Sequence, residues 1–346
     1  MGDRSVARVI VTAILGGALL VAAARGGPAP GLGAILFERQ KGFSSRLFTM
    51  QADGSAQRPT GLPVNAEWSP RGRYMAYKVS GQDGKTRLYV ADRAGRRLNA
   101  KPLVADSCLG ELAWSPDETR LAYANYCDVD FSELFVIGRN GRGRRKLVRA
   151  DWQIKPRWSP DGRTILFGFN PRPQTRYGWF LYVVRPDGSG LRRLPNSSTY
   201  PDYSADWGFS RDGSRVFMVS RGSFEVLNVK TGKRTKLAPD LQVGEYSLSP
   251  DGRRLAVQAA PLVTREARDW EIFTLTPDGS DRRQLTENVK QDGGPRWSRD
   301  GRQILFWSER DGNSEVYVMN ADGTNQANLS RHPGEDVLPS WVPPRR

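Results

Sequence analysis

The sequence contains very little histidine and cysteine. Its 346 residues include one histidine, His332, and two cysteines, Cys108 and Cys127. A single histidine excludes metal sites built on several histidines, and no cysteine cluster is present. A Ser-His-Asp hydrolase would have to use His332, but no Gly-x-Ser-x-Gly segment supplies a nucleophile. The sequence therefore predicts no metal ion, no cofactor and no catalytic residue.

Nucleotide-binding and calcium-binding loops are also missing. The chain has neither a phosphate-binding glycine loop nor a dinucleotide-binding fingerprint. Its Asp-Gly pairs lack the alternating acidic residues of a calcium loop, so we interpret them as turns.

One continuous apolar run occupies residues 9–24. It follows Arg4 and Arg8, and the alanines at 22–24 offer a small-residue cleavage site, so residues 1–24 are predicted to be an export signal. The run of about 16 residues is slightly short for a relaxed membrane span, and an uncleaved membrane anchor is the alternative. Residues 25–33 are rich in Gly and Pro and form a linker. N-terminal sequencing of the mature protein distinguishes cleavage from anchoring.

A six-residue segment, Trp-Ser-Pro-Asp-Gly-Arg at 158–163, recurs along the chain. Aligned copies begin at Trp68, Trp114, Phe209, Leu248 and Trp297, and a truncated copy begins at Trp341. Successive copies lie 39 to 51 residues apart. A period near 45 residues is typical of a propeller blade, because four short strands and their turns consume about 40–45 residues.

Each repeat encodes the same series of strands and turns. The Trp segment is the innermost strand, and the Ser-Pro-Asp-Gly turn leads to an apolar second strand, as at 165–168. A loop of varied length, a third strand such as 181–184, and a tight turn such as Asp187-Gly188 follow. A basic stretch forms the outermost strand. We interpret the Trp residues as packing anchors between neighbouring blades.

The two ends of the chain together supply one more repeat. Residues 35–37, 47–50 and 53–54 match a second strand, a third strand and a turn, but no Trp-Ser-Pro precedes them. The missing innermost strand appears at 338–342. Six complete units and one shared unit predict an all-β propeller of seven four-stranded blades over residues 34–346. The C-terminal strand joins the N-terminal blade, which closes the ring and removes an open sheet edge.

The repeats resemble the TolB-like propeller repeats of bacterial envelope proteins, also called WD40-like Pro-Asp repeats. The consensus of that family is Trp-Ser-Pro-Asp-Gly, an Ile/Leu-x-Phe strand and an aromatic-bearing third strand, and the resemblance covers about residues 34–342. It implies an exported, non-catalytic scaffold that binds proteins through the mouth of its channel. TolB itself has six blades. Similar repeats occur in prolyl oligopeptidase-type peptidases, where an α/β-hydrolase domain follows.

Three aspartates are candidate ligand-binding residues. Asp292 and Asp336 each lie five residues before an anchor Trp, and Asp206 lies three residues before Phe209. Loops that enter the innermost strands converge on the central channel, so we expect these carboxylates at its mouth. There they could hold a cation, an amine or a basic peptide. The alternative is that they cap the strands and are hydrated.

Two long loops are candidate partner-binding segments. One is an insertion at 170–177, and the other spans 261–270. Long loops on a rigid scaffold are the usual place for recognition. The candidate residues are Arg172, Tyr177, Trp179, Arg265, Arg268 and Trp270.

Basic residues outnumber acidic ones, 52 to 37, which gives a net charge of +15. They concentrate in the expected fourth strands, at 96–97, 142–146, 192–193, 233–236 and 282–283. Charges on outer edges block pairing between molecules. The alternative is a basic belt that holds the protein near anionic envelope polymers or phospholipid headgroups. A nucleic-acid partner is not expected, because binding would need a concentrated basic patch with stacking aromatics.

The function predicted from these observations is a monomeric, exported scaffold of the bacterial envelope that binds a protein or an anionic polymer. Its location would be the periplasm, the cell envelope or the extracellular space. One alternative is a polysaccharide-active or other hydrolytic enzyme that uses channel carboxylates as acid and base. The other is the ectodomain of a sensor anchored through residues 9–24.

Cys108 and Cys127 are predicted to form a disulfide. They flank residues 114–119, and a hairpin centred between Asp117 and Glu118 would place them opposite each other. Cross-strand Cβ atoms lie about 4.5–5.5 Å apart, close to disulfide reach. A disulfide also suits an exported protein. The alternative is two buried thiols.

We expect the exported protein, digested without reduction, to yield a peptide cross-linked between Cys108 and Cys127. Mass spectrometry should detect this species, and reduction should abolish it. Because the bridge would close a loop of roughly 20 residues, its removal is expected to cost about 3 kcal/mol of stability. Recovery of both cysteines as alkylated free thiols would contradict the prediction.

Overall fold

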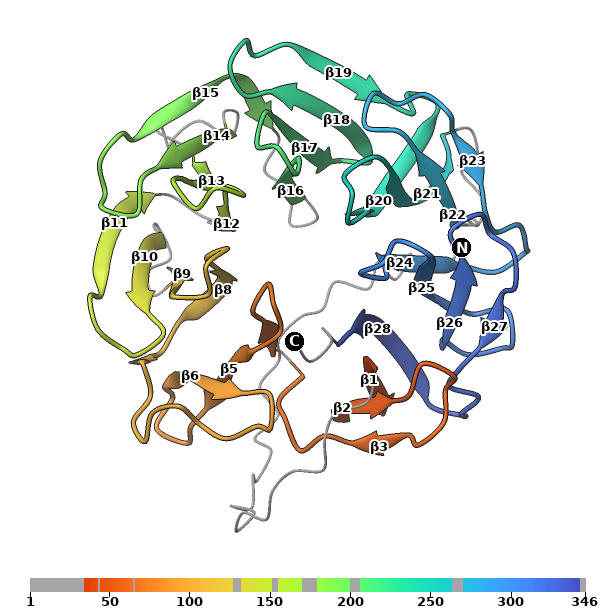
Figure 1. Ribbon diagram of the computed structural model, residues 1–346, viewed down its shortest axis with the longest axis horizontal. Coiled ribbons are helices and arrows are strands. Elements are labelled where there is room, and N and C mark those ends of the chain that lie inside the picture. Colours follow the sequence, from red (N-terminus) through yellow and green to blue (C-terminus); the bar gives the residue numbers. More distant parts are fainter. Residues whose placement is uncertain are drawn as a thin grey trace, which may run out of the picture.

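The protein folds into a ring of β-sheets. The computed structural model describes residues 34–342, except 43, 65, 127–131, 151–154, 170–178, 200–205 and 263–269. The regular elements of these residues are all β-strands, which form seven four-stranded sheets around a central axis (Figure 1). The predicted seven-bladed propeller is confirmed. No helix in the described part of the chain is long and apolar enough to cross a membrane.

The blades follow one another along the chain, and each runs from an innermost first strand to an outermost fourth strand. The first three blades are β28 (Glu335–Trp341), β1 (Ile35–Lys41), β2 (Ser44–Met50) and β3 (Arg58–Pro59); β4 (Glu67–Trp68), β5 (Tyr74–Ser80), β6 (Thr86–Asp92) and β7 (Val104–Asp106); and β8 (Leu109–Trp114), β9 (Arg120–Asn125), β10 (Ser132–Gly138) and β11 (Arg145–Ala150). The next two are β12 (Arg157–Trp158), β13 (Ile165–Phe169), β14 (Trp179–Val184) and β15 (Arg192–Thr199); and β16 (Asp206–Phe209), β17 (Arg215–Ser220), β18 (Ser223–Asn228) and β19 (Arg234–Leu237). The last two are β20 (Leu241–Leu248), β21 (Leu255–Pro261), β22 (Glu271–Leu275) and β23 (Arg283–Gln284); and β24 (Asp292–Trp297), β25 (Gln303–Ser308), β26 (Glu315–Asn320) and β27 (Ala327–Asn328).

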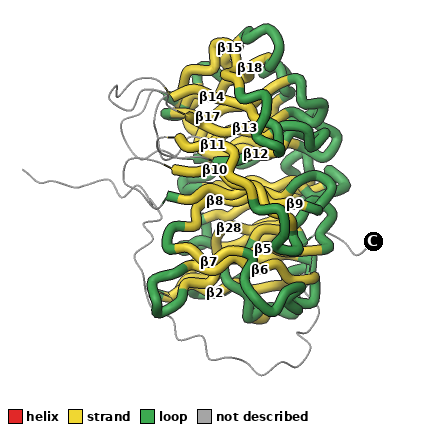
Figure 2. The backbone as a smooth tube through the Cα atoms, turned by 90° about the vertical axis from the view of Figure 1, so that its left-hand side faces the viewer, coloured by secondary structure: helices red, strands yellow, loops and turns green. Residues whose placement is uncertain are grey.

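The antiparallel strands give the ring two different faces. On one face the first strand of each blade turns into the second, and the third into the fourth; we call this the turn face. On the other, the loop face, the second strand connects to the third and each blade passes to the next. Figure 2 shows the ring edge-on, with connections at both ends of the strands.

The repeated Ser-Pro-Asp-Gly segment forms a side-chain-locked turn. In the third complete unit, Ser159 Oγ donates a hydrogen bond to Asp161 Oδ1 at 2.6 Å, and the Arg163 N–H donates to the same oxygen at 3.0 Å. These bonds lower the pKa of Asp161 and keep it ionised at neutral pH. Gly162 has a φ of 68°, in the left-handed region that glycine adopts without strain. The motif thus fixes the turn between the first two strands.

The anchor tryptophans join neighbouring blades, as predicted. In three of the five anchors the indole N–H donates to a backbone carbonyl in the innermost strand of the preceding blade, whereas those of Trp68 and Trp297 have no partner among the described residues. The bonds are Trp114 to Glu67 at 3.0 Å, Trp158 to Ala113 at 3.1 Å and Trp341 to Arg296 at 3.1 Å. The rings of Trp114 and Trp158 are buried between the sheets.

The two blades without an anchor Trp use an aromatic residue two positions earlier. Trp207, before Phe209, is 4% exposed and packs in the core between blades. Tyr246, before Leu248, packs at a tilt against Phe217 of the preceding blade with 6.2 Å between ring centroids. Residues two apart in a strand point to the same side, so the shifted ring occupies the same side of the sheet.

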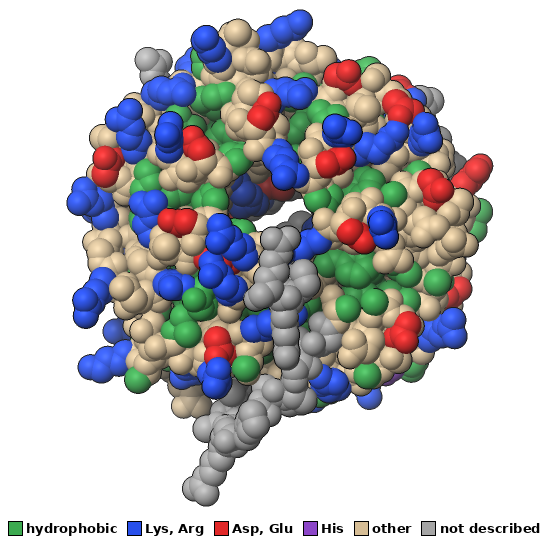
Figure 3. All heavy atoms as spheres, viewed as in Figure 1, with side chains coloured by type: hydrophobic (Ala, Val, Ile, Leu, Met, Phe, Trp, Pro, Cys, Tyr) green, Lys and Arg blue, Asp and Glu red, His purple; other side chains and the backbone are tan. Residues whose placement is uncertain are grey.

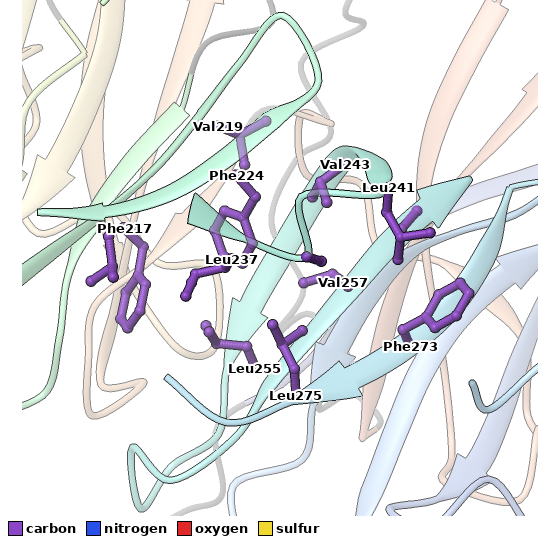
Figure 4. Packing of buried hydrophobic residues seen from close by; sticks show 13 residues of the cluster. Phe217, Val219, Phe224, Leu237, Leu241, Val243, Leu255, Val257, Phe273 and Leu275 are labelled. Atoms are coloured by element: carbon purple, nitrogen blue, oxygen red, sulfur yellow. The ribbon is translucent and has the colours of Figure 1, made fainter. Parts of the chain in front are cut away.

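The hydrophobic core is divided into clusters between adjacent blades. In the cluster of Figure 4, Phe217 and Phe224 from β17 and β18 pack with Leu255 and Phe273 from β21 and β22. Leu237, at the end of β19, lies between the two sheets and is fully buried. Because every blade buries both sides against neighbours, the stability of each blade depends on a closed ring.

The ring is closed by pairing of the C-terminal strand with the N-terminal blade, as predicted. β28 pairs with β1 in antiparallel register, with Ile35 opposite Trp341 and Gln40 opposite Glu335. The contact extends one residue further, because the Val342 N–H donates to the Ala34 carbonyl at 2.8 Å.

The strand register around the cysteines differs from the predicted hairpin. Leu112 lies opposite Tyr123, as a hairpin centred between Asp117 and Glu118 requires. A β-bulge then shifts the register by one residue, so the Cys108 carbonyl accepts the Tyr126 N–H at 2.9 Å. Cys108 is therefore level with Tyr126, because the bulge adds one residue to β8. Cys127 lies outside the described residues, and the disulfide stays a prediction.

Part of the basic sequence also lies elsewhere than predicted. Arg96 and Arg97 precede the fourth strand β7, and Arg142 precedes β11. These residues belong to connections on the turn face, because the fourth strands are shorter or begin later than the basic stretches. The positive charge is consequently concentrated toward one face of the ring.

Glu118 replaces the motif glycine in the second complete unit and links two blades. Its φ is 62° and its side chain is fully buried. The carboxylate accepts bonds from Ser69 Oγ, the Arg71 N–H and Arg73 Nε, each at 2.6 Å. Burial opposes ionisation, but these bonds outweigh it and lower the pKa of Glu118. The strained backbone is held by three bonds to the neighbouring turn.

We expect Glu118→Gln to destabilise the propeller by roughly 2 kcal/mol at pH 7, because charge-assisted hydrogen bonds are lost. The folded-state pKa lies below the unfolded value of about 4.3, so this contribution is present above pH 5 and vanishes as the pH falls toward the folded pKa. Urea unfolding at pH 7 and pH 4 measures the difference.

Glu133→Gln is a matched control. Glu133 forms one partly exposed ion pair with Lys146 at 3.0 Å, so the loss should stay below about 1 kcal/mol. Equal losses for the two variants would contradict the role of Glu118.

Candidate binding channel

A channel runs through the centre of the ring and is lined by the innermost strands. Figure 3 views the turn face and shows an opening at the middle of the ring, with both basic and acidic side chains around it. The innermost strands β4, β8, β12, β16, β20, β24 and β28 surround this axis. Residues that alternate with the buried anchors on these strands point away from the inter-blade core.

Charged residues from several blades meet in this channel. Arg157 pairs with Asp206 of the next blade at 2.9 Å. Arg296 pairs in the same way with Glu245 of the preceding blade at 2.9 Å. Arg157 also interacts electrostatically with Glu67, two blades away, which requires proximity across the lumen. The channel therefore carries charges of both signs.

Glu67 and Glu111 are the unneutralised carboxylates of the channel. Both side chains are exposed to the lumen, and neither forms a hydrogen bond or an ion pair with another residue of the described chain. Both interact electrostatically with Arg157 and with Lys78, whose ammonium donates to the Gly110 carbonyl at 3.0 Å. Two acidic groups are thus available to a ligand on one side of the channel.

The pKa values of Glu67 and Lys78 are shifted because both side chains lie in the narrow channel. The lumen admits water, yet protein surrounds each side chain on most sides. This environment raises the pKa of Glu67, partly opposed by Arg157. It lowers the pKa of Lys78, partly opposed by Glu111 and Glu67. A cationic ligand group would stabilise the ionised form of Glu67, so the site favours amines or guanidinium groups.

The structure does not bring the three predicted aspartates together at an open mouth. Asp336 is fully buried and both of its oxygens accept bonds from Arg39, each at 2.7 Å. Asp292 is also fully buried and pairs with Arg310 at 2.8 Å. Asp206 is partly exposed and faces the channel through its pair with Arg157. Of the three, only Asp206 adjoins the charged lumen.

Asp292 instead belongs to a buried carboxyl pair between blades. Glu271, at the start of β22, accepts bonds from Thr286 Oγ1 at 2.5 Å and the Asn288 N–H at 2.7 Å. Asn288 Nδ2 links the two carboxyl groups, because it donates to Asp292 Oδ2 at 2.9 Å and to Glu271 Oε2 at 3.4 Å. Asp292 Oδ1 has no hydrogen-bond partner among the described residues. Burial and the Asp292 carboxylate raise the pKa of Glu271 to about 7.

The predicted partner-binding loops are only partly described. Arg172, Tyr177, Arg265 and Arg268 lie outside the described residues. Trp179 begins β14 and is buried at 9% exposure, so in this structure it is a packing residue. Trp270 is half-buried next to Gly244. Their roles in partner binding stay predictions.

Sequence reasoning missed the charged residues of the lumen. Glu67, Arg157 and Arg296 each stand immediately before an anchor Trp. That position alternates with the buried indole, which was the available signal for a channel-facing residue. The residue type at this position varies from repeat to repeat, so the position does not stand out in an alignment of the shared motif.

We expect the stability of Glu271→Gln relative to the native protein to rise between pH 5 and pH 8. The folded protein holds a proton on Glu271 to about pH 7, whereas the unfolded chain loses it near pH 4.3. The native protein therefore loses stability as the pH rises through this window, by an amount on the order of 2 kcal/mol. Denaturant unfolding across the range measures this trend.

Asp292→Asn provides the control background. Removing the neighbouring carboxylate lowers the pKa of Glu271, so the same Glu271→Gln comparison should depend less on pH. A stability difference that is constant from pH 5 to pH 8 in the native background would be inconsistent with a raised pKa of Glu271.

Comparison with known proteins agrees with this architecture. Residues 208–345 match the model of the TolB β-propeller domain. The chain is 33% identical over 232 residues to a TolB homologue of Chlorobium luteolum, covering 66% of this chain and 51% of the relative. It is 27% identical over 111 residues to dipeptidyl-peptidase 5 of Porphyromonas endodontalis, covering 30% of this chain and 16% of that protein. The chain thus spans about half, or less, of the length of these relatives.

A solved structure shares the fold. The β-propeller domain of the trilobed protease from Pyrococcus furiosus superposes with a TM-score of 0.65 at 12% identity, covering 87% of this chain and 97% of that domain. Propellers of TolB proteins and of peptidases are therefore both similar to this one. The family model over residues 208–345, the curated homologue and the repeat architecture agree, and together they identify the propeller as TolB-like.

Proposed function

We propose that the protein is an exported, non-catalytic scaffold of the bacterial envelope that binds a protein or polymer segment at its central channel. The observation that carries this proposal is the charged lumen, in which Glu67 and Glu111 lack an ionic partner while the other acids are paired. Unpaired, desolvated carboxylates favour a partner that brings amines or guanidinium groups. A basic peptide segment has this chemistry.

Location in the envelope is part of the proposal. The apolar run at 9–24, preceded by Arg4 and Arg8, supports export, with or without cleavage. Similarity to TolB-like propellers supports the same compartment.

Similarity to peptidases is compatible with a binding role for the propeller. The match to dipeptidyl-peptidase 5 covers 16% of that protein, so its activity does not transfer to this chain. The pair Glu271 and Asp292 is buried and accepts hydrogen bonds from Thr286, Asn288 and Arg310. A catalytic acid and base would have to be accessible.

We expect the full-length protein to capture a specific envelope component from a membrane extract through its channel. Glu67→Gln combined with Glu111→Gln should reduce capture at least about fivefold, because charge complementarity to the ligand is lost. Quantitative mass spectrometry of cross-linked pull-downs compares the variants.

The matched control is Asp53→Asn combined with Asp322→Asn, which removes two exposed carboxylates far from the channel. It should leave capture unchanged. Retention of the same component by the channel variant, or no component enriched by the native protein, would overturn the proposal.

A further inference from the structure

The positive charge of the protein is concentrated on the turn face. The connections of this face, between first and second and between third and fourth strands, carry 19 Lys or Arg and 11 Asp or Glu. This excess of eight positive charges accounts for about half of the net charge of +15. The loop face is close to neutral by comparison. The positive charge of the ring therefore lies mainly on its turn face.

Within this face, the charge forms an arc over four consecutive blades. The connections at 92–97, 139–145, 185–193 and 229–234, from β6 to β19, hold thirteen Lys or Arg and two Asp. The corresponding segments of the other three blades, at 51–58, 276–283 and 321–327, each include the first residue of the fourth strand, and together they hold three Arg and four Asp. Figure 3 shows Lys and Arg side chains gathered along the left and upper rim, where these four blades lie.

Some of the arginines in the basic arc are held in place without being neutralised. Arg97 lies over the Tyr89 ring at 3.9 Å and donates to Tyr77 Oη at 3.0 Å. Arg144 donates to Tyr123 Oη at 2.7 Å. Aromatic and hydroxyl partners orient the guanidinium but leave its charge.

Other members of the arc are free to meet a partner. The exposed residues Arg142, Arg145, Arg192 and Lys233 form no ion pair with another described residue. Spread over three blades, they present a broad positive surface without a pocket. Such a surface suits an extended anionic layer better than a small anion, which needs convergent donors.

The position of β1 favours a phospholipid bilayer as the anionic layer that the basic arc contacts. Ile35 pairs with Trp341 at the turn-face end of β28, so the chain enters the propeller on the same face as the basic arc. Residues 25–33 separate this entry point from the apolar run at 9–24 and span at most about 30 Å when extended. An apolar segment and a basic surface on one face are complementary to a bilayer with anionic headgroups.

We propose that the turn face, through the basic arc, docks on the surface of an anionic phospholipid membrane. The propeller axis then stands roughly perpendicular to the bilayer. The loop face and the loop-side entrance of the channel point away from the membrane, toward partners in the adjoining compartment. The docking surface is separate from the channel, so it does not depend on the proposed channel ligand.

Flotation of the full-length protein with vesicles tests this proposal. Vesicles of phosphatidylcholine alone are compared with vesicles that also contain about 30% phosphatidylglycerol, at 0.1 M salt. We expect at least about tenfold stronger binding to the anionic vesicles, since each basic residue near such a surface contributes severalfold. Raising the salt to about 0.5 M should abolish the preference, because the Debye length shortens.

Charge-reversal variants locate the surface. Arg142→Glu, Arg145→Glu, Arg192→Glu and Lys233→Glu, combined in one chain, should remove the preference for anionic vesicles. The control combines Lys41→Glu, Arg46→Glu, Lys85→Glu and Lys290→Glu, four exposed residues at the loop face with the same total change in charge. It should retain at least half of the preference. Because all eight positions are exposed, both variants should keep the native melting temperature within a few degrees.

Three results would overturn the proposal. The native protein could bind neutral and anionic vesicles equally at low salt. The two four-residue variants could lose the preference to the same extent, which would indicate net charge without a defined surface. Binding to purified anionic cell-wall polymer without any preference for anionic vesicles would assign the arc to a polymer instead. The salt titration of the native protein decides the first point even if a variant fails to fold.

Discussion

Pairing of β28 with β1 is the constraint on which the rest of the structure depends. The hydrophobic clusters lie between blades, so a ring left open would expose the facing sides of its first and last blades. Closure supplies the missing neighbour by sharing one blade between the two ends of the chain. It also places Trp341 against the preceding blade, where its indole N–H reaches the Arg296 carbonyl at 3.1 Å. Backbone pairing and side-chain packing close the ring together.

The fold was predictable from the sequence because the repeat is a local code. A Ser, an Asp and a Gly at fixed spacing specify the turn, and the neighbouring aromatic specifies the contact between blades. Each copy of the motif specifies the same turn and the same contact between blades, so a repeat that departs from the consensus still forms a blade. Trp207 and Tyr246 illustrate this tolerance, since an aromatic two residues earlier reaches the same side of its strand. Near Cys108 a β-bulge interrupts the pairing of β8 with β9, and there the predicted register was wrong by one residue.

The candidate site was less predictable because it depends on residues that meet only after closure. Glu67, Glu111 and Arg157 come from three blades and influence one another across the axis. No local pattern reveals such a meeting. The same limit applies to Asp292 and Asp336, which lie at the start of the innermost strands β24 and β28 with their side chains buried in the protein. Arg310 and Arg39, each from the second strand of the same blade or just beyond it, hold them there. Each aspartate is buried because an arginine pairs with it, and the spacing of the motif did not identify that arginine.

The turn face is more basic than the loop face because the two faces carry different kinds of connection between strands. Short turns of the turn face use Asp, Gly and charged residues at little structural cost, so charge can accumulate there without disturbing the blades. The loop face carries the long connections, which are able to vary in length. Because β28 contributes the innermost strand, β1 must be a second strand and must start on the turn face. The mode of closure therefore decides where the N-terminal segment joins the ring. A ring closed instead by an N-terminal innermost strand would begin on the loop face and separate residues 9–24 from the basic arc.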